Sequence, residues 1–212
     1  MPGGHLFVIA APSGAGKTSL VKALLEREPQ LRVCVSHTTR PKRPNEIDGH
    51  DYHFVDRERF RRMVRDGAFL EHAAVFDNDY GTSLGALQDA FGAGFDIVLE
   101  IDWQGARQVR AKVPECISIF VLPPSRLALE QRLHNRRTDS PEVIARRLRD
   151  AVTDMGHYGE FDCVVVNDDF ETAVADLRRI IAAARDSGVA AAGLDPERAS
   201  LRPLVGELLG KG

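Results

Sequence analysis

The sequence has few cysteines, a single tryptophan and no strong excess of either charge. The three cysteines among its 212 residues, Cys34, Cys116 and Cys163, stand far apart and form no CxxC pair. This spacing argues against a disulfide framework and against a zinc site. The seven histidines also lack the paired spacing of metal ligands. We therefore expect the cysteines to be buried packing residues.

The formal net charge of −3 provides no basic field, so we expect no nucleic-acid partner. No apolar run approaches the length that crosses a bilayer, which predicts no membrane association. The first residues lead directly into an apolar run, without the charged segment and cleavage site of a secretion signal. We expect a cytoplasmic protein, and its sequence identifies no protein partner. A hydrophobic content of 43% and a length of 212 residues suit one substantial α/β domain.

A glycine-rich loop between a predicted strand and a predicted helix is the most informative stretch. It comprises Ala11–Ser19, follows the apolar run Leu6–Ala10, and precedes an amphipathic segment that begins at Leu20. Gly14 and Gly16 allow backbone N–H groups to surround an anion without clashes from Cβ atoms. The N-terminus of the following helix adds unpaired donors and partial positive charge. This arrangement predicts a phosphate-binding loop.

The loop also predicts a bound Mg²⁺. The Lys17 side chain would reach the terminal phosphates, and the Thr18 hydroxyl would ligate Mg²⁺. Ala11 stands where the pattern usually has Gly, and Ala tolerates backbone conformations that do not need positive φ, so we expect the loop to form. The expected phosphate contacts, which the family resemblance described below assigns to ATP, are Ala11, Pro12, Ser13, Gly14, Ala15, Gly16, Lys17, Thr18 and Ser19.

Predicted strands and helices alternate along the chain, which indicates an α/β fold with a doubly wound, mostly parallel sheet. We expect strands at residues 6–10, 31–36, 97–102, 117–122 and 163–166, and helices at 20–27, 57–64, 83–91, 125–137, 141–157 and 170–185. In the helix at 125–137, Leu127 and Leu133 are expected to point inward. Residues 36–90 mix short elements and form an insertion. The segment after Asp186, including Pro203–Gly212, is expected to be weakly packed.

Several runs of the sequence resemble bacterial guanylate kinases, over residues 5 to about 185. The resemblance implies a P-loop enzyme that transfers a phosphoryl group from Mg·ATP to GMP or dGMP, giving ADP and GDP. It implies a nucleotide-binding core (1–35, 92–124 and 156–186), a GMP-binding insertion (36–91), a helical lid (125–155) and a C-terminal tail (187–212). The runs that carry it are Ala11–Ser19, Ser36–Pro44, Phe69–His72, Tyr80–Ser83, Glu100–Gly105 and Val166–Asp169.

Glu71 is the residue that would select guanine. Guanine presents an N1–H and a 2-amino group side by side, and one carboxylate accepts both, whereas adenine offers no such pair of donors. A site built for these hydrogen bonds rejects a base that lacks them by as much as ~10⁴. By resemblance, the remaining GMP contacts are Arg40, Arg43, Tyr52 and Tyr80 at the phosphate, Ser36 and Thr82 at the base, and Glu100 and Asp102 at the end of a strand.

The carboxylates of Glu100 and Asp102 would also orient the water shell of Mg²⁺, which takes few protein ligands. The family usually has Asp at the position of Glu100 and Gly at that of Arg137. Phosphoryl transfer depends on positioning and charge stabilisation, for which the planar guanidinium is suited. The resemblance implies that lid closure brings arginines onto the transferring group and that Asn167 and Arg136 contact adenine. The expected catalytic residues are Lys17, Arg43, Arg132, Arg136 and Arg147.

Two alternative functions share this scaffold. One is a kinase of another phosphorylated ribose or nucleotide, against which Glu71 together with Thr82 argues. The other is a catalytically inactive guanylate-kinase-like module that binds phosphorylated peptides. Such modules typically lose the lysine of the phosphate loop or the lid arginines, and this chain has Lys17 and the three lid arginines.

Overall fold

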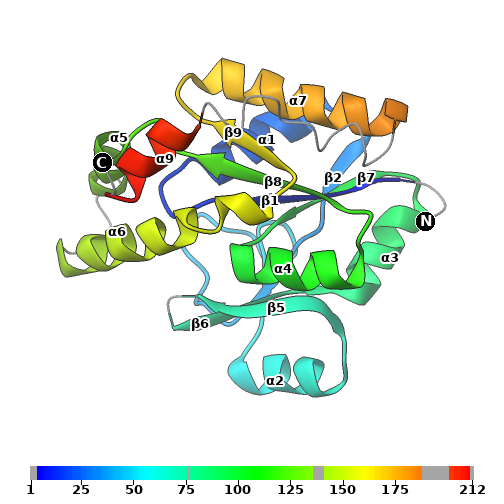
Figure 1. Cartoon of the computed structure of the whole chain (residues 1–212). Coiled ribbons are helices and arrows are strands. Elements are labelled where there is room, and N and C mark those ends of the chain that lie inside the picture. The colour runs from blue at the N-terminus through cyan, green and yellow to red at the C-terminus, as the bar shows by residue number, and fades with distance from the viewer. Residues whose placement is uncertain (1–3, 76, 136–140, 188–200, 211–212) are drawn as a thin grey trace. The chain divides into compact units, whose positions relative to one another are not determined.

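The structure is a computed structural model, and it describes residues 4–75, 77–135, 141–187 and 201–210. Strands and helices alternate along most of this length (Figure 1). The strands are β1 (Leu6–Ala10), β2 (Leu31–Val33), β3 (His37–Thr38), β4 (His53–Phe54), β5 (Phe69–Val75), β6 (Asn78–Ser83), β7 (Asp96–Glu100), β8 (Ile117–Leu122) and β9 (Cys163–Val166). The helices are α1 (Lys17–Arg27), α2 (Arg57–Arg65), α3 (Leu84–Gly92), α4 (Trp103–Lys112), α5 (Arg126–His134), α6 (Pro141–Met155), α7 (Phe170–Ser187) and α9 (Arg202–Leu208), with a 3₁₀ turn at Tyr158–Glu160.

The strands form two sheets, which confirms the predicted α/β fold with a mixed insertion. The five-stranded sheet has the order β2-β7-β1-β8-β9, with β2 parallel to β7 and β8 parallel to β9. The four-stranded sheet has the order β4-β3-β6-β5, with parallel and antiparallel pairs. Every residue of β1 and β8 is buried, as the continuous apolar runs predict for strands covered on both faces.

The chain divides into two compact units. The first unit comprises Met1–Val8 and Pro29–Cys116, and the second unit comprises Ile9–Glu28 and Ile117–Gly212.

In the first unit, short helices are fixed by capping side chains. Asp56 caps α2, because its Oδ1 accepts the backbone N–H of Arg59 at 2.6 Å. The Phe60 ring of α2 then packs on the Phe69 ring of β5, with centroids 4.7 Å apart. Ser83 caps α3 in the same way, through the N–H of Ala86. The antiparallel pair β5–β6 and the whole of α4 lie in stretches for which the sequence predicts no element.

In the second unit, α1 and α7 lie side by side (Figure 1). Arg27 and Glu171 join them through two hydrogen bonds of 2.7 and 2.9 Å. The Glu28 carboxylate, just after α1, accepts from Arg178 and Arg185 of α7, each at 2.8 Å. The second unit thereby fixes the helix that follows the glycine-rich loop.

Some local predictions are wrong. Leu127 is 64% exposed, and Leu129 and Leu133 are the residues of α5 that are buried. The predicted strand at 31–36 ends at Val33, and the next residues lead into β3 of the other sheet.

Residues 203–210 were expected to be weakly packed, but most of them belong to α9, which packs on α6. Val205 and Leu208 of α9 are buried because their apolar side chains recur three residues apart on one helix face. Residues 188–200 lie outside the described residues.

All three cysteine side chains are buried thiols, as predicted. Among the helices of the described ranges, none combines the length and the apolar character that a bilayer crossing requires.

Candidate active site

The glycine-rich loop of the second unit has the backbone that its sequence predicts. Gly14 and Gly16 have φ values of +93° and +94°, which side chains with a Cβ rarely adopt. A Cβ on Gly16 would overlap the Nδ2 atom of Asn167, and one on Gly14 would lie 2.9 Å from Cδ1 of Leu129. Ala11 has no positive φ, so alanine is accommodated there. Both the conformation and the close neighbours require the two glycines.

Two side chains hold the loop through one carbonyl group. The backbone oxygen of Ala15 accepts a hydrogen bond from Asn167 Nδ2 at 2.7 Å and one from Arg132 Nη1 at 3.3 Å. Arg132 also donates from Nη2 to the backbone oxygen of Asn167 at 2.9 Å. The guanidinium and the amide therefore fix the position of the loop against α5 and the end of β9.

A cavity of about 310 Å³ opens beside this loop. The helix α1 begins there without an acidic residue in its first turn, so its N–H groups and the Lys17 side chain provide positive potential. Asp168 and Phe170 are wall residues that the sequence did not identify individually, although Asp168 belongs to the run Val166–Asp169. The residues that line the cavity are Gly14, Gly16, Ser19, Arg132, Asn167, Asp168 and Phe170.

The donor set beside the loop fits Mg²⁺ with ATP. Thr18 lies in the first turn of α1 and is exposed. Within the described ranges, no group of three or more His, Cys, Asp or Glu side chains could hold a metal ion. A cation bound here would take its remaining ligands from phosphate oxygens and water, which is the coordination that Mg²⁺ favours.

Three predicted base contacts come together in the first unit. Glu71 is only 2% exposed, and its Oε1 accepts the Thr82 hydroxyl at 2.7 Å. The Ser36 hydroxyl lies 3.4 Å from that of Thr82. This cluster forms because β3 pairs with β6 and β6 with β5, which places Glu71 opposite Thr82. A carboxylate beside two hydroxyls is a polar cluster that can accept hydrogen-bond donors.

The predicted phosphate contacts also lie close together in the first unit. The rings of Tyr52 and Tyr80 pack edge to face with centroids 5.9 Å apart, and the Arg40 guanidinium lies 5.5 Å from the Tyr52 centroid. Burial, with the nearby charges of Tyr80 and Glu100, raises the pKa of Tyr52 to about 12. Tyr52 therefore stays a neutral phenol that can donate a hydrogen bond to an anion.

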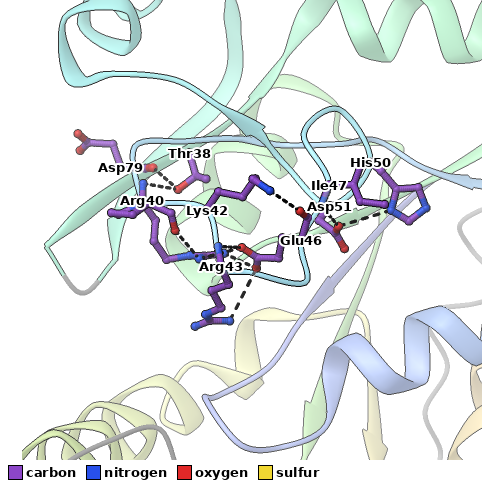
Figure 2. A network of polar contacts seen from close by, with 10 residues as sticks. Thr38, Arg40, Lys42, Arg43, Glu46, Ile47, His50, Asp51 and Asp79 are labelled. Carbon is purple, nitrogen blue, oxygen red and sulfur yellow. Dashed lines mark hydrogen bonds and ion pairs between the residues drawn. The ribbon is translucent and has the colours of Figure 1, made fainter.

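Glu46 organises the same loop, and the sequence did not single it out. It accepts two hydrogen bonds from Arg40 and one from the backbone N–H of Arg43 (Figure 2). The Arg43 side chain is 61% exposed. The only sequence signal for Glu46 was a carboxylate close to the basic run Arg40–Arg43.

Asp102 has a structural role in the first unit that the sequence did not predict. Its Oδ1 accepts the backbone N–H of Gly105 at 2.8 Å, which makes it the N-cap of α4. Its contact with GMP or with the water shell of Mg²⁺ remains a prediction, as does that of Glu100, which is half-buried at the end of β7. Arg147 is half-buried on α6, and Arg136 and Arg137 lie outside the described residues.

Comparisons with known proteins identify the family to which the sequence and the fold are similar. The profile of the guanylate kinase family matches residues 3–184. The chain is 57% identical to the guanylate kinase of Alkalilimnicola ehrlichii over 185 residues, covering 87% of this chain and 91% of that protein. It is 58% identical to the guanylate kinase of Methylococcus capsulatus over 181 residues, covering 85% and 89%. The crystal structure of guanylate kinase from Anaplasma phagocytophilum is similar, with a TM-score of 0.72, 34% identity and 94% of each chain covered.

Proposed function

The chain belongs to the guanylate kinase family, and we propose that it binds each of its two nucleotides on a separate set of residues. Its activity is that of a guanylate kinase, which transfers a phosphoryl group from ATP to GMP. The observation that best supports separate nucleotide sites is the buried Glu71 carboxylate of the first unit, which is hydrogen-bonded to Thr82. The loop Ala11–Ser19 and its cavity lie in the second unit.

Glu71 selects guanine in this proposal. Its carboxylate has acceptor positions beyond the one that Thr82 uses, and the N1–H and 2-amino groups of guanine are two adjacent donors. The hydroxyls of Ser36 and Thr82 contact the rest of the guanine edge. Adenine would bring no matching pair of donors to the buried carboxylate, and a site built for hydrogen bonds discriminates strongly against a base that lacks them.

The phosphate of GMP, or of dGMP, is held by arginine and tyrosine side chains of the first unit. Arg40 and Arg43 provide charge-assisted donors, and Tyr52 and Tyr80 provide hydroxyls. Glu100 and Asp102 complete the predicted GMP contacts, with the Asp102 carboxylate already engaged in capping α4.

ATP binds at the glycine-rich loop in this proposal. Backbone N–H groups and Lys17 hold its phosphates, and Thr18 ligates Mg²⁺. Mg²⁺ when bound neutralises charge on the phosphate oxygens. Asn167 contributes from the wall of the same cavity, where it also supports Ala15. Arg132, Arg136 and Arg147, with Lys17 and Arg43, stabilise the transferring phosphoryl group, which requires Arg132 to exchange its carbonyl partners for phosphate oxygens.

The division of the chain into parts is also proposed. It comprises the core (1–35, 92–124, 156–186), the insertion (36–91), the lid (125–155) and the tail (187–212). In the structure α5 contacts the glycine-rich loop through Arg132, so movement of residues 125–155 as one lid would break those hydrogen bonds. We place the enzyme in the cytoplasm, where buried thiols such as its three cysteines stay reduced.

A coupled assay of ADP release with GMP, dGMP, AMP, CMP and UMP tests the proposed substrate range. We expect turnover with GMP and dGMP and little with the other three. A preference for another nucleotide would contradict the role of Glu71, and an absence of turnover with every nucleotide would favour the phosphopeptide-binding module.

A further inference from the structure

We propose that Glu46 is a positioning residue for the monophosphate, because its carboxylate fixes Arg40 and the backbone at Arg43 in the conformation that binds a phosphate monoester. This inference deepens the proposed function and rests on it. Glu46 lies in the irregular segment between β3 and β4, whose prolines and polar residues form no regular element. Some other contact must therefore hold the segment in place.

Hydrogen bonds to Glu46 provide that contact. Arg40 donates from Nη2 to Oε1 at 2.6 Å and from Nη1 to Oε2 at 3.1 Å. The backbone N–H of Arg43 donates to Oε2 at 2.8 Å, and the Glu46 N–H donates back to the Arg43 carbonyl at 3.1 Å. Lys42 Nζ donates to the Glu46 carbonyl at 2.9 Å. Figure 2 shows the Glu46 carboxylate between the Arg40 side chain and the Arg43 backbone.

The Arg40–Glu46 pair is partly buried, unlike most ion pairs of this chain. The two side chains are 14% and 15% exposed, so water screens the pair little. Burial opposes the ionisation of both groups, but their mutual hydrogen bonds outweigh it. The pKa of Arg40 is raised and that of Glu46 lowered from the ordinary values. Glu46 is therefore an anion at neutral pH and holds Arg40 by charge as well as by geometry.

Glu46 leaves both arginines able to bind a second anion. Arg40 donates from Nη1 to Glu46 and to the Pro41 carbonyl, and from Nη2 to Glu46. A guanidinium has five N–H donors, so these three hydrogen bonds leave N–H groups that can donate to another anion. The Arg43 side chain is 61% exposed, and its Nη1 lies 3.8 Å from Glu46. With Lys42, the three cations and Glu46 carry a net charge of about +2, which matches the charge of up to about −2 on a phosphate monoester.

Competition and positioning predict opposite changes in GMP affinity when Glu46 is removed, so an experiment can distinguish them. If Glu46 competes with phosphate for Arg40, its removal makes the site more positive and tightens GMP binding. If it positions Arg40, removal loosens the segment, and GMP binding weakens despite the added positive charge.

The experiment compares wild-type protein with the variants E46Q, E46A and E46D. In the ADP-release assay we expect the KM for GMP to rise about tenfold or more in E46Q and E46A, and the KM for ATP to stay unchanged. The value of kcat at saturating GMP should change much less than the KM for GMP. E46D keeps the charge but is shorter, so its KM for GMP should lie between wild type and E46Q. Direct calorimetry of GMP binding should follow the same order.

The matched control is E58Q in the same unit. Glu58 forms an exposed pair with Arg62 on α2 at 3.5 Å, and its side chain is 83% exposed. This variant should retain wild-type kinetics. Thermal unfolding measurements identify any variant that fails to fold.

An unchanged or lower KM for GMP in folded E46Q would overturn the positioning role. A parallel rise of the KM for ATP would also overturn it, because the loss would then not be specific to the monophosphate. An absence of GMP-dependent ADP release in wild-type protein would instead contradict the proposed function.

Discussion

At the scale of single residues, the proposed selection of guanine depends on a carboxylate that is almost inaccessible to solvent. Glu71 is 2% exposed, and its Oε1 accepts the Thr82 hydroxyl in a 2.7 Å hydrogen bond. Its charge also contributes, after burial, to raising the pKa of the neighbouring Cys34 thiol to about 11. A base that offers two donors fits this environment best.

Replacing Glu71 by Gln should remove the preference for guanine. The Gln amide group would face the donors of guanine with donors of its own, while its carbonyl can still accept from Thr82. We expect the ratio of kcat/KM for GMP to that for AMP to fall at least ~100-fold in the ADP-release assay. The matched control is E115Q, which changes an exposed carboxylate of the same unit. A variant that melts like wild type and keeps its preference would refute the role of Glu71.

The sequence predicted part of the site at this scale. The loop Ala11–Ser19 was identified from its own pattern, because the spacing of Gly, Lys and Thr is local. Glu71 and Arg40 were identified only through resemblance, because an isolated carboxylate or arginine resembles any surface residue in sequence. Glu46 was missed, since its importance depends on how an irregular segment folds back on itself.

At the scale of elements, the close approach of α4 to β5 sets the position of Glu71. A Cβ added to Gly105, in the first turn of α4, would lie 2.5 Å from Glu71 Oε2 and 3.2 Å from its Cδ. The N-cap at Asp102 fixes this turn through the N–H of Gly105 itself. The φ of Gly105 is not positive, so the neighbouring Glu71 side chain, and not the backbone conformation, favours glycine here.

Replacing Gly105 by Ala should therefore displace the Glu71 carboxylate. We expect the KM for GMP to rise about tenfold or more, with the KM for ATP unchanged, in steady-state assays. The matched control is G85A on α3, where a Cβ meets nothing within 4 Å. Because Ala favours helix more than Gly, G85A should keep wild-type kinetics and melt at the same or a higher temperature. Equal kinetics for the two variants would contradict this account.

The elements themselves were predicted unequally. Residues 6–10, 117–122 and 163–166 were predicted as strands with their observed bounds, because buried parallel strands are continuous apolar runs. The helix α4 was missed because its sequence is mostly polar, and β3 was missed because two residues are too few for any periodic pattern. The short β-like segment expected at His53–Val55 corresponds to β4. The pair β5–β6 was missed because its residues alternate between buried and exposed only in part.

At the scale of the whole molecule, we expect a buried histidine to contribute to the pH dependence of folding stability. His37 is 9% exposed, and its Nδ1 has no hydrogen-bond partner in the part of the chain that the structure describes. Burial, together with the charges of His53 and Arg59, lowers the pKa of His37 from 6.5 to about 4, while Asp48 opposes the shift. The unfolded chain therefore takes up this proton near pH 6.5 and the folded protein only near pH 4.

The contribution of His37 to stability should be present above pH 6.5 and be lost as the pH falls toward 4. We expect wild-type protein to lose about 2 kcal/mol of unfolding free energy between pH 7.5 and pH 5 from this group, measured by urea denaturation. In H37Q this part of the loss should disappear, whatever its stability at pH 7.5. The control H134Q, at an exposed histidine of α5, should keep the wild-type pH dependence. The same loss in H37Q as in wild type would show that another group is responsible.

The proposed assignment of the two nucleotide sites to different units leads to a further prediction. Lys17 belongs to the second unit, and the proposed GMP contacts belong to the first. K17A should therefore reduce turnover at least ~100-fold, while calorimetry shows GMP affinity within about twofold of wild type. K22A, at an exposed lysine of the same helix, is the matched control. A parallel loss of GMP affinity in K17A would contradict this separation.

The three buried cysteines also make the protein suited to fluorescence labelling. Thiols that are shielded from solvent, one of them with a pKa of about 11, react slowly with maleimide dyes. Cysteines introduced at the exposed positions Asn45 and Glu130, one in each unit, would then be the main sites of dye attachment. Energy transfer between the two dyes would report the distance between the units in solution, before and after each nucleotide is added.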